Sequence, residues 1–326
     1  MHAALADAPG APFRVVALPR PEPTAGQVLV RIAASGVNPL DTKIHAGQAA
    51  HARQPLPAVL GLDLAGTVEA VGAGVMAFRP GDVVYGLAGG VGGLPGTLAE
   101  YAAVDADLLA HKPRNLGLRE AAALPLVLIT AWEGLVDRAN VRAGQKVLVH
   151  GGAGGVGHVA IQIARAFGAE VFATGSAANA AAIRRLGATP IDYRASSVDA
   201  YVAEHTAGLG FDLVYDTVGG ATLDASFAAV RRFGHVVSCL GWGSHALGPL
   251  SFRAATYSGV FTLLPMLTGA GRAQHGEILR QAAALVEAGH LAPTVDPRHF
   301  TLATVAEAHA AITAGTAAGK IVVDIG

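Results

Sequence analysis

The amino-acid sequence predicts an α/β protein in which a β-rich first part is followed by a doubly wound parallel sheet. Short apolar runs separated by glycine and proline clusters fill the first part. From about Arg119, alanine-rich helical segments alternate with short apolar strands, which is typical of βαβ units and a parallel sheet. The chain has 326 residues, enough for about two domains with large cores.

Short strands are expected in the first part. Glycine and proline clusters, such as those at 71–74 and 79–82, divide it into brief apolar runs. The expected strands are 27–33, 66–71, 82–85 and 98–104.

The second part has the alternation of strands and helices that makes one complete Rossmann sheet. The expected strands are Lys146–His150, 170–174, 190–193, 212–216, 235–240 and 257–263. The expected helices between them are 156–167, 177–186, 197–205 and 221–233.

A helix at 273–288 and a strand at 320–325 follow that sheet and have no partner in it. They most simply return to the first part, which makes the first domain discontinuous. We therefore expect one domain of residues 1–122 and 264–326 and a second of residues 123–263.

A glycine-rich turn follows the first strand of the second part. Gly152, Gly154 and Gly157 form the pattern G-x-G-x-x-G, with Gly155 and Val156 inside it. The first glycine permits a tight bend, the second lets the backbone approach a pyrophosphate, and the third lets the helix pack closely on the sheet. Free N–H groups at the helix N-terminus can bind the phosphates. This strand–turn–helix context predicts a bound dinucleotide cofactor.

The choice of cofactor depends on the residues after the next strand. An NAD site usually carries Asp or Glu there, on the ribose hydroxyls. This chain has Thr174-Gly175-Ser176-Ala177, with no carboxylate to repel a 2′-phosphate. Ser176 can donate to that phosphate, although Asn179 stands where a cation would help. NADP(H) is therefore favoured.

The composition excludes several classes of protein. With 52% hydrophobic and 14% charged residues, the chain fits a compact enzyme and not a disordered protein. The net charge of -1 gives no long-range attraction to nucleic acid or anionic membranes. A single cysteine, Cys239, excludes an internal disulfide and every multi-cysteine metal site. We see no secretory signal and no apolar run that could span a bilayer, so a cytoplasmic location is expected.

Besides the glycine loop, seven stretches of the chain have a distinctive sequence: 35–41, 61–68, 96–101, 124–126, 130–132, 216–219 and 319–322. Together they resemble the medium-chain dehydrogenase/reductase superfamily, and within it the zinc-independent quinone oxidoreductase (zeta-crystallin-like) family. The resemblance covers essentially the whole chain and implies that the β-rich part is a GroES-like catalytic domain.

Zinc-binding members of the superfamily would have Cys in place of Asn38, a His–Glu pair in place of Leu62 and Asp63, and Cys or Asp near Leu126. None of these ligands is present. A catalytic zinc needs three N, S or O ligands, so no metal is expected. Without a Lewis acid, the plausible hydride acceptors are activated on their own: quinones, or alkenes conjugated to a carbonyl.

The resemblance also implies roles for single residues. Asn38 and Asp41 would lie in the active-site loop near the nicotinamide and the acceptor, or would merely shape a turn. Lys43 and His45 of the same loop could relay a proton, but we favour solvated side chains. The implied cofactor contacts, in addition to the glycine loop, Ser176 and Asn179, are Thr130, Tyr193, Leu240, Gly241, Trp242 and Lys320.

Some of these cofactor contacts have a simpler interpretation. Thr130 would otherwise be an ordinary threonine inside a helix. Tyr193 would be a half-buried tyrosine at a strand end, and Trp242 a surface or dimer aromatic.

Together these observations predict an NADPH-dependent, zinc-free reductase of quinones or α,β-unsaturated carbonyls. One alternative is an enoyl-thioester reductase of the same superfamily. Another, from a different class, is a non-catalytic NADPH-binding structural or RNA-binding protein, although the neutral charge argues against RNA.

A homodimer is expected through the sixth strand of the Rossmann sheet. The apolar segment 257–264 ends the sheet and would leave an exposed edge that invites pairing with a second copy. Two-fold symmetry would make such an interface self-complementary. Replacing Val260 with proline is expected to remove a donor from that edge.

Overall fold

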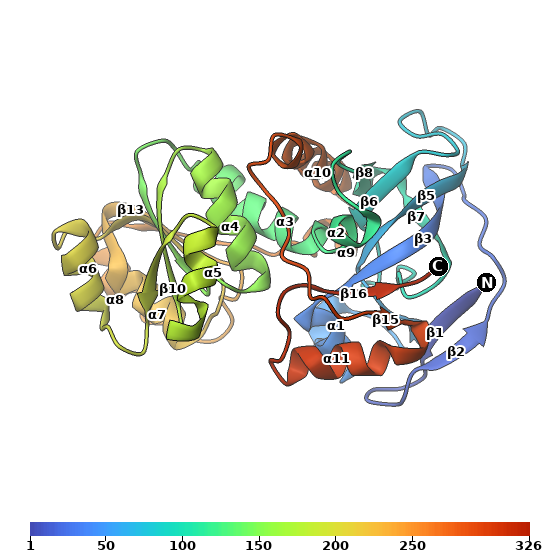
Figure 1. The fold of residues 1–326 in the computed structure, drawn as a ribbon, viewed down its shortest axis with the longest axis horizontal. Helices are drawn as coiled ribbons and strands as arrows, with labels where there is room; N and C mark the ends of the chain where they lie inside the picture. The colour runs from blue at the N-terminus through green and yellow to red at the C-terminus, as the bar shows by residue number, and fades with distance from the viewer. The chain divides into compact units, whose positions relative to one another are not determined.

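The computed structural model describes all 326 residues, and the chain divides into two compact units. One unit comprises Met1–Leu126, Leu263–Gly289 and Pro293–Gly326, and the other comprises Val127–Thr262 and His290–Ala292. N-terminal (blue) and C-terminal (red) segments thus share the first unit (Figure 1). The domain boundaries expected from the sequence lie after residue 122 and after residue 263.

A seven-stranded sheet forms the body of the first unit. Six of its strands have the order β15-β16-β3-β5-β6-β8, and the seventh, β7, pairs with β3. The long strand β3 pairs with β5 along one side, while β7 and β16 pair with its first and second halves on the other. The strands are β3 (Gln27–Val37), β5 (Asp63–Val71), β6 (Val83–Leu87), β7 (Tyr101–Asp105), β8 (Leu109–His111), β15 (Phe300–Thr301) and β16 (Ile321–Asp324).

A small antiparallel sheet and several helices complete this unit. The sheet has the order β2-β1-β4, with β1 (His2–Ala6), β2 (Arg14–Ala17) and β4 (Ala58–Val59). The helices are α1 (Pro39–His45), η1 (Ala50–Ala52), η2 (Ala106–Leu108), α2 (Leu118–Ala122), α9 (Leu264–Thr268), α10 (Arg272–Glu287), η5 (Leu302–Thr304) and α11 (Val305–Thr313), while α3 (Pro125–Trp132) begins here and runs into the second unit.

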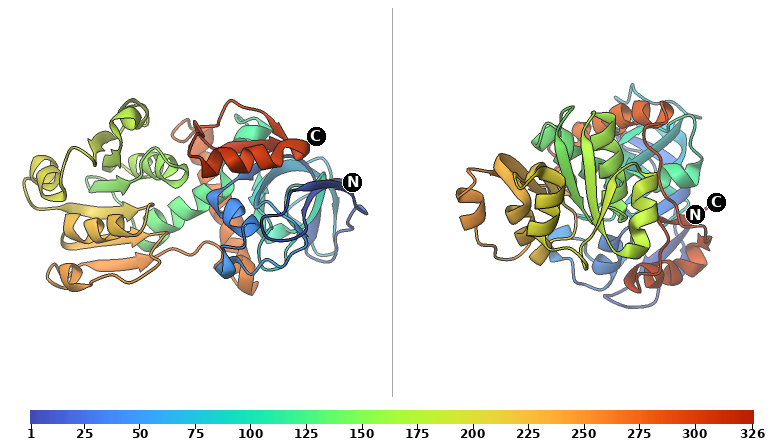
Figure 2. Two further views of the ribbon diagram at one scale, coloured as in Figure 1. Left: turned by 90° about the horizontal axis from the view of Figure 1, so that it is seen from below. Right: turned by 60° about the vertical axis from the view of Figure 1, so that its left-hand side comes forward.

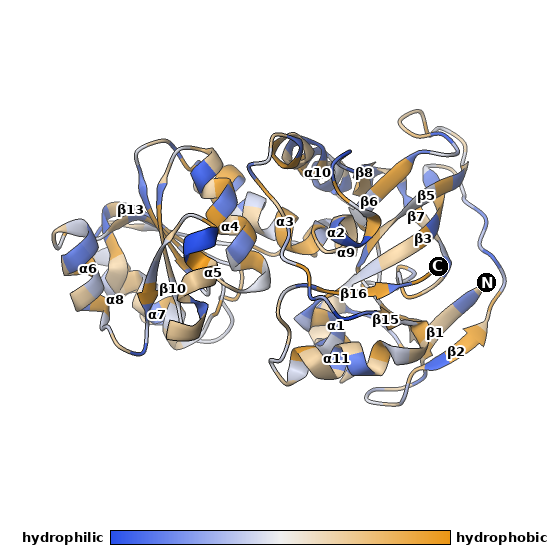
Figure 3. Cartoon of the chain, in the orientation of Figure 1, coloured by the Kyte–Doolittle hydropathy of each residue, from blue (hydrophilic) through white to orange (hydrophobic).

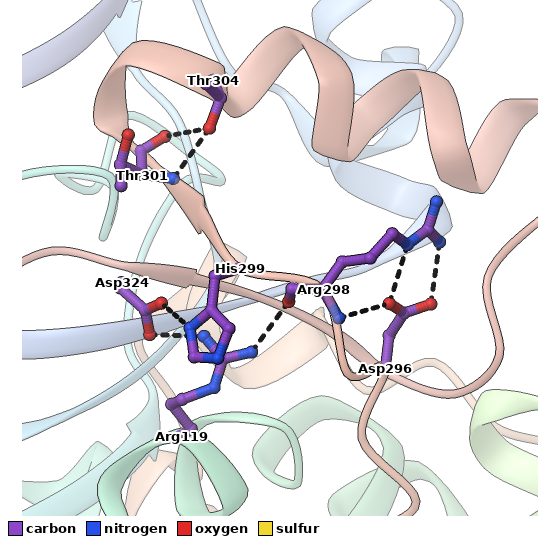
Figure 4. A network of polar contacts seen from close by, with 7 residues as sticks. All are labelled: Arg119, Asp296, Arg298, His299, Thr301, Thr304 and Asp324. Atoms are coloured by element: carbon purple, nitrogen blue, oxygen red, sulfur yellow. Dashed lines mark hydrogen bonds and ion pairs between the residues drawn. The ribbon is translucent and has the colours of Figure 1, made fainter.

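Polar contacts fasten the C-terminal segment to α2 (Figure 4). Arg119 of α2 pairs with Asp324 of β16, 205 positions away, and donates to the Arg298 carbonyl at 3.0 Å. His299 Nδ1 lies 2.8 Å from the same Asp324 carboxylate. Asp296 receives two hydrogen bonds of 2.8 Å from the Arg298 guanidinium. These contacts join residues from both ends of the chain within one unit.

The second unit is built on a six-stranded, all-parallel sheet with the order β11-β10-β9-β12-β13-β14. This is the Rossmann order, so the predicted α/β class and doubly wound sheet are confirmed. The strands are β9 (Lys146–His150), β10 (Glu170–Gly175), β11 (Thr189–Asp192), β12 (Phe211–Asp216), β13 (Val230–Ser238) and β14 (Thr256–Gly259).

Helices cover both faces of this parallel sheet (Figure 2). The covering helices are η3 (Glu133–Arg138), α4 (Gly155–Ala166), η4 (Ala177–Asn179), α5 (Ala180–Arg185), α6 (Val198–Thr206), α7 (Ala221–Ala229) and α8 (Gly248–Ser251). Aromatic residues such as Phe172, Phe211 and Phe227 fill the core under α6 and α7. Hydrophilic residues gather on the outer helices (Figure 3). None of the helices in the chain is both long and apolar enough to cross a membrane.

The structure corrects two expected elements of the second unit. The helix expected at 221–233 ends at Ala229, because Val230 already pairs with Phe211 while His235 pairs with Leu213. The residues between form a bulge with Phe233 at a φ of +58°. The sixth strand ends at Gly259 and not at residue 263.

Candidate functional site

The glycine loop follows β9 directly and has no room for side chains at two positions. A Cβ on Gly152 would lie 2.6 Å from the Ala173 Cβ, and one on Gly157 would lie 2.1 Å from the Gly151 carbonyl oxygen. Gly154 is exposed, and its Cβ would meet only the Gly151 oxygen, at 3.1 Å. The first and third glycines of the motif therefore allow close packing, whereas the second leaves the backbone at the start of α4 exposed on an open surface.

Backbone donors at the start of α4 face that open surface. The first bond within α4 joins the His158 N–H to the Gly154 carbonyl at 3.0 Å. The N–H groups of Gly155, Val156 and Gly157 therefore have no partner within the helix. Such groups at a helix N-terminus bind phosphate. The loop fits the pyrophosphate of a dinucleotide.

Thr174 and His150, which the sequence analysis did not single out, tie the loop to the sheet. Thr174 Oγ1 accepts a hydrogen bond from the Gly151 N–H at 3.2 Å and lies 3.0 Å from His150 Nδ1. Burial lowers the pKa of His150 to about 4, so its ring is neutral at pH 7. Both residues stand at carboxyl ends of central strands, where ligands of such sheets bind.

In the first unit, a buried polar cluster lies where β3 ends and α1 begins. It consists of Asn38, Asp41, Asp63 and Lys320, none of them more than 5% exposed. Asn38 Nδ2 donates to Asp63 Oδ2 at 2.8 Å. The Lys320 ammonium donates to Asn38 Oδ1 and, at 3.1 Å, to the Val37 carbonyl. The Asn38 amide is thus held by a carboxylate at one end and by an ammonium at the other.

Sheet register and a helix start bring these four residues together. Gly36 of β3 pairs with Asp63 of β5, and Val37 pairs with Ile321, the neighbour of Lys320. Asn38 precedes Pro39, the first residue of α1. Three sequence segments that lie far apart therefore meet at one end of β3.

Asp41 and Asp63 also bind backbone groups. Asp41 Oδ2 accepts the Asn38 N–H at 2.7 Å, which is the contact of a turn-shaping residue. Its other oxygen, Oδ1, is buried without a partner. Asp63 Oδ1 accepts the Leu126 N–H at 2.9 Å.

Burial shifts the protonation of the whole cluster. Desolvation raises the pKa of Asp41 to about 8, and the nearby Asp63 charge adds to the effect. Desolvation also raises the pKa of Asp63 to about 6, although Lys320 and Asn38 oppose it. Burial lowers the pKa of Lys320, while the carboxylates of Asp63 and Asp41 act in the opposite direction and raise it. Near pH 7 the cluster holds a neutral Asp41 carboxyl and an ionised Asp63 beside the lysine.

The residues at the expected zinc place do not fit a catalytic zinc. The side chains of Leu62 and Leu126 offer no ligand atom, and the Lys320 ammonium already binds the oxygen of Asn38. No group of three His, Cys, Asp or Glu side chains is arranged to hold a metal ion. A zinc site needs at least three such ligands.

The residues expected around the adenosine phosphate gather at one end of the parallel sheet. Ser176 directly follows β10, and its hydroxyl makes no capping bond. Tyr193 follows β11, is 55% exposed, and donates its N–H to the Gly175 carbonyl at 3.3 Å. Asn179 is exposed just before α5. Arg194, which the sequence analysis did not single out, lies beside Tyr193.

The remaining expected cofactor contacts of the second unit lie on α3 and after β13. Thr130 is buried, with Oγ1 3.0 Å from Thr262 Oγ1. Leu240 N–H binds Ser238 Oγ at 3.0 Å, and Gly241 is exposed. Trp242 is 54% exposed and packs edge-on against Phe261.

Three expected residues of the first unit have different surroundings. Lys320 was expected to contact the cofactor, and its ammonium is buried against Val37 and Asn38. Lys43 is exposed on α1. His45 stacks on Phe13 with ring centroids 4.3 Å apart.

Two family models match the chain. Residues 24–114 match the alcohol dehydrogenase GroES-like domain, and residues 186–323 match a family described as zinc-binding dehydrogenase. Among curated relatives, the tomato 2-methylene-furan-3-one reductase is 37% identical over 93% of this chain and 73% of its own length. The chain belongs to the medium-chain dehydrogenase/reductase superfamily.

Other members support a place near the quinone oxidoreductases. The chloroplastic NADPH-dependent alkenal/one oxidoreductase of Arabidopsis thaliana is 35% identical over 93% of this chain and 73% of its own length. Human quinone oxidoreductase is 32% identical over 93% of this chain and 90% of its own length. The predicted resemblance is confirmed: the chain is a quinone-oxidoreductase-like, NAD(P)-binding oxidoreductase of this superfamily.

A solved structure of a superfamily member has nearly the same fold. The crystal structure of an alcohol dehydrogenase superfamily protein from Novosphingobium aromaticivorans is 60% identical, covers 100% of both chains, and has a TM-score of 0.98. The GroES-like first domain and the Rossmann sheet are thus features that this chain shares with the superfamily.

Proposed function

We propose that this protein uses NADPH to reduce quinones, or alkenes conjugated to a carbonyl, by hydride transfer without zinc. The observation that carries the proposal is the environment of Asn38. Its amide binds the Lys320 ammonium and the Asp63 carboxylate, where a zinc enzyme would need metal ligands. Acceptors that delocalise negative charge by themselves do not require a Lewis acid. The names of the enone- and quinone-reducing relatives agree with this choice.

The free N–H groups of Gly155 and Val156 would hold the pyrophosphate of a nicotinamide cofactor, which would supply the hydride. On the acceptor side, Asn38 Nδ2 has a second hydrogen besides the one donated to Asp63. The ammonium on Asn38 Oδ1 polarises the amide, which strengthens that second donor. We propose that this second hydrogen donates to the acceptor oxygen and stabilises the negative charge that develops there.

Asp41 keeps a proton in the same cluster. Its raised pKa leaves the carboxyl neutral near pH 7, with Oδ1 unpartnered. A neutral carboxyl avoids a second negative charge beside Asp63. The proton that completes the reduction comes from solvent.

We propose NADPH over NADH, because no carboxylate follows β10 and both Ser176 and Tyr193 offer hydroxyl groups there. The margin is about tenfold, or about 1.4 kcal/mol. Titration of the protein with each nucleotide measures it directly, and equal or tighter NADH binding contradicts the preference.

We also propose a cytoplasmic homodimer that pairs β14 with its copy. The Val260 N–H bonds to the Ser238 carbonyl at 2.9 Å, within the sheet. Because N–H directions alternate along a strand, the N–H groups of Tyr257 and Gly259 face outward. This geometry corrects the sequence-based choice of Val260 for a proline test, since its donor does not lie on the free edge.

A panel of acceptors tests the proposed reaction. NADPH oxidation is followed with a small quinone, an enal, an enoyl-CoA ester and no acceptor, each with and without a chelator. We expect turnover with a quinone or the enal, unchanged by the chelator. A clear preference for the thioester would support the alternative reductase, and NADPH binding without any turnover would support a non-catalytic binder.

A further inference from the structure

Arg194 presents an unpaired cation beside the end of the second strand of the Rossmann sheet. It is exposed, and no carboxylate lies within 4.0 Å of its guanidinium. Its Nε donates to the Tyr193 hydroxyl at 3.3 Å, and the guanidinium centre lies 5.6 Å from the Tyr193 ring centroid. An arginine held against an aromatic ring loses less freedom when it binds an anion.

The backbone places this arginine next to Ser176. The Tyr193 N–H donates to the Gly175 carbonyl at 3.3 Å, so the turn after β11 lies against the end of β10. Ser176 is the next residue after Gly175, and its hydroxyl makes no capping bond. Arg194 and Ser176 therefore flank one point at the carboxyl end of the sheet, where dinucleotides bind.

The single carboxylate in this turn is already engaged. Asp192 Oδ1 accepts the Arg194 N–H at 3.0 Å. That bond folds the chain back after β11 and fixes the backbone from which the Arg194 side chain extends. The carboxylate of Asp192 therefore positions the arginine and does not neutralise its guanidinium.

We propose that Arg194 is the residue that selects NADPH, by binding the 2′-phosphate of its adenosine together with Ser176. The inference rests on the proposed use of a dinucleotide and names the residue that sets its class. Guanidinium groups bind phosphate oxygens with directed, charge-assisted hydrogen bonds. Tyr193 acts here as a positioning residue, through its ring and hydroxyl.

The test compares nucleotide fragments that differ only in the 2′-phosphate. Calorimetric titrations with 2′,5′-ADP and 5′-AMP are made on the wild type, on Arg194→Gln and on Arg185→Gln. Arg185 is the matched control, because it is an exposed arginine on α5 and its loss changes the net charge equally. None of these substitutions touches the glycine loop.

We expect Arg194→Gln to weaken 2′,5′-ADP binding about tenfold or more, equal to about 1.4 kcal/mol, and to leave 5′-AMP binding unchanged. The salt dependence of 2′,5′-ADP binding should also become shallower. Arg185→Gln should bind both fragments like the wild type. Asp192→Asn keeps the acceptor for the Arg194 N–H, removes a negative charge, and should tighten 2′,5′-ADP binding.

Two results would overturn the assignment. In one, Arg194→Gln and Arg185→Gln weaken 2′,5′-ADP binding equally, so only overall charge matters. In the other, the wild type binds 5′-AMP as tightly as 2′,5′-ADP. That result would be consistent with a cofactor site but would contradict the proposed role of Arg194 in binding the 2′-phosphate. If the wild type binds neither fragment nor NADH, the proposed cofactor function itself fails along with it.

Discussion

The amide of Asn38 is held between opposite charges, and this single residue explains most of the candidate site. Its Oδ1 faces the Lys320 ammonium and its Nδ2 faces Asp63, so the side chain cannot rotate without placing like groups together. An amide fixed in this way offers its last hydrogen in one direction only. The positioning comes from Lys320, which lies 282 positions away in the sequence.

Replacing Lys320 with methionine should destabilise the protein by about 3–5 kcal/mol. The change leaves the buried Asp63 carboxylate without its cation, and burial without a partner is costly. Urea unfolding at neutral pH measures the loss. The double variant Lys320→Met with Asp63→Asn removes both charges and should be more stable than Lys320→Met alone. Equal stability of the single and double variants would show that the two charges are not coupled.

Asp41 should make stability fall as the pH rises. Burial raises its pKa from 3.8 to about 8, so the folded state holds this proton more tightly than the unfolded state. The stabilisation is complete below about pH 4 and is lost as the pH rises through about 8, at roughly 1.4 kcal/mol per unit of pKa difference. In Asp41→Asn the free energy of unfolding should therefore fall less between about pH 5 and about pH 9. Parallel pH profiles for the two proteins would contradict the buried, neutral carboxyl.

At the residue scale, the sequence pointed to Asn38 and Asp41 because the family resemblance places both in the active-site loop. It did not predict the contact of Lys320 with Asn38, because that contact depends on the pairing of β16 with β3. Arg194 was also missed. Only the bond between Tyr193 and Gly175 reveals that the turn after β11 lies beside Ser176.

At the scale of elements, different glycines of the glycine loop are expected to serve packing and cofactor binding. We expect Gly157→Ala to destabilise the fold by about 1–3 kcal/mol, since its Cβ would lie 2.1 Å from a backbone oxygen. Gly154→Ala should fold normally, because its Cβ meets only one atom, at 3.1 Å, yet it should weaken NADPH binding roughly tenfold by narrowing the approach to the backbone. Thermal unfolding and nucleotide titration of both variants separate the two effects. A Gly154→Ala protein that binds NADPH normally would show that this surface does not contact the cofactor.

The edge strand β14 gives a second test at this scale. Gly259→Pro removes an outward N–H and should raise the dimer dissociation constant about tenfold or more without losing a bond inside the sheet. Val260→Pro instead removes the bond to Ser238 and should lower the stability of each protomer. Sedimentation analysis at several concentrations distinguishes them. A wild-type protein that is monomeric at micromolar concentration would contradict the proposed dimer.

The accuracy of the predicted elements followed the strength of their local patterns. The strand at Lys146–His150 and the helix after it were predicted within one residue, because apolar periodicity and glycines mark both ends. The start of β13 was missed, because the run from Val230 to Phe233 contains no residue that stops a helix. The preceding helix α7 ends where Val230 begins to pair with β12, and this pairing forms only in the folded sheet.

At the scale of the whole molecule, each of the two domains carries a feature on which the proposed function rests. The Rossmann domain offers free backbone donors for a dinucleotide, and the GroES-like domain offers a buried, charged amide in place of metal ligands. The doubly wound order and the return of the C-terminal strand were predicted from the alternation of strands and helices. The acceptor was predicted only as a class, because loop shape determines a substrate pocket.

Transfer of a labelled hydride by metal-free protein tests the central claim most directly. Protein purified with a chelator is assayed for zinc and is then mixed with an enal and with NADPH in which both hydrogens on the nicotinamide C4 are deuterium. The product is examined by mass spectrometry. We predict that the product carries deuterium on the carbon β to the carbonyl. We also predict that protein with far less than one zinc per chain forms this product as fast as protein that was not treated with the chelator. A rate that rises and falls with bound zinc, or a reduced product that carries no label, would contradict the account.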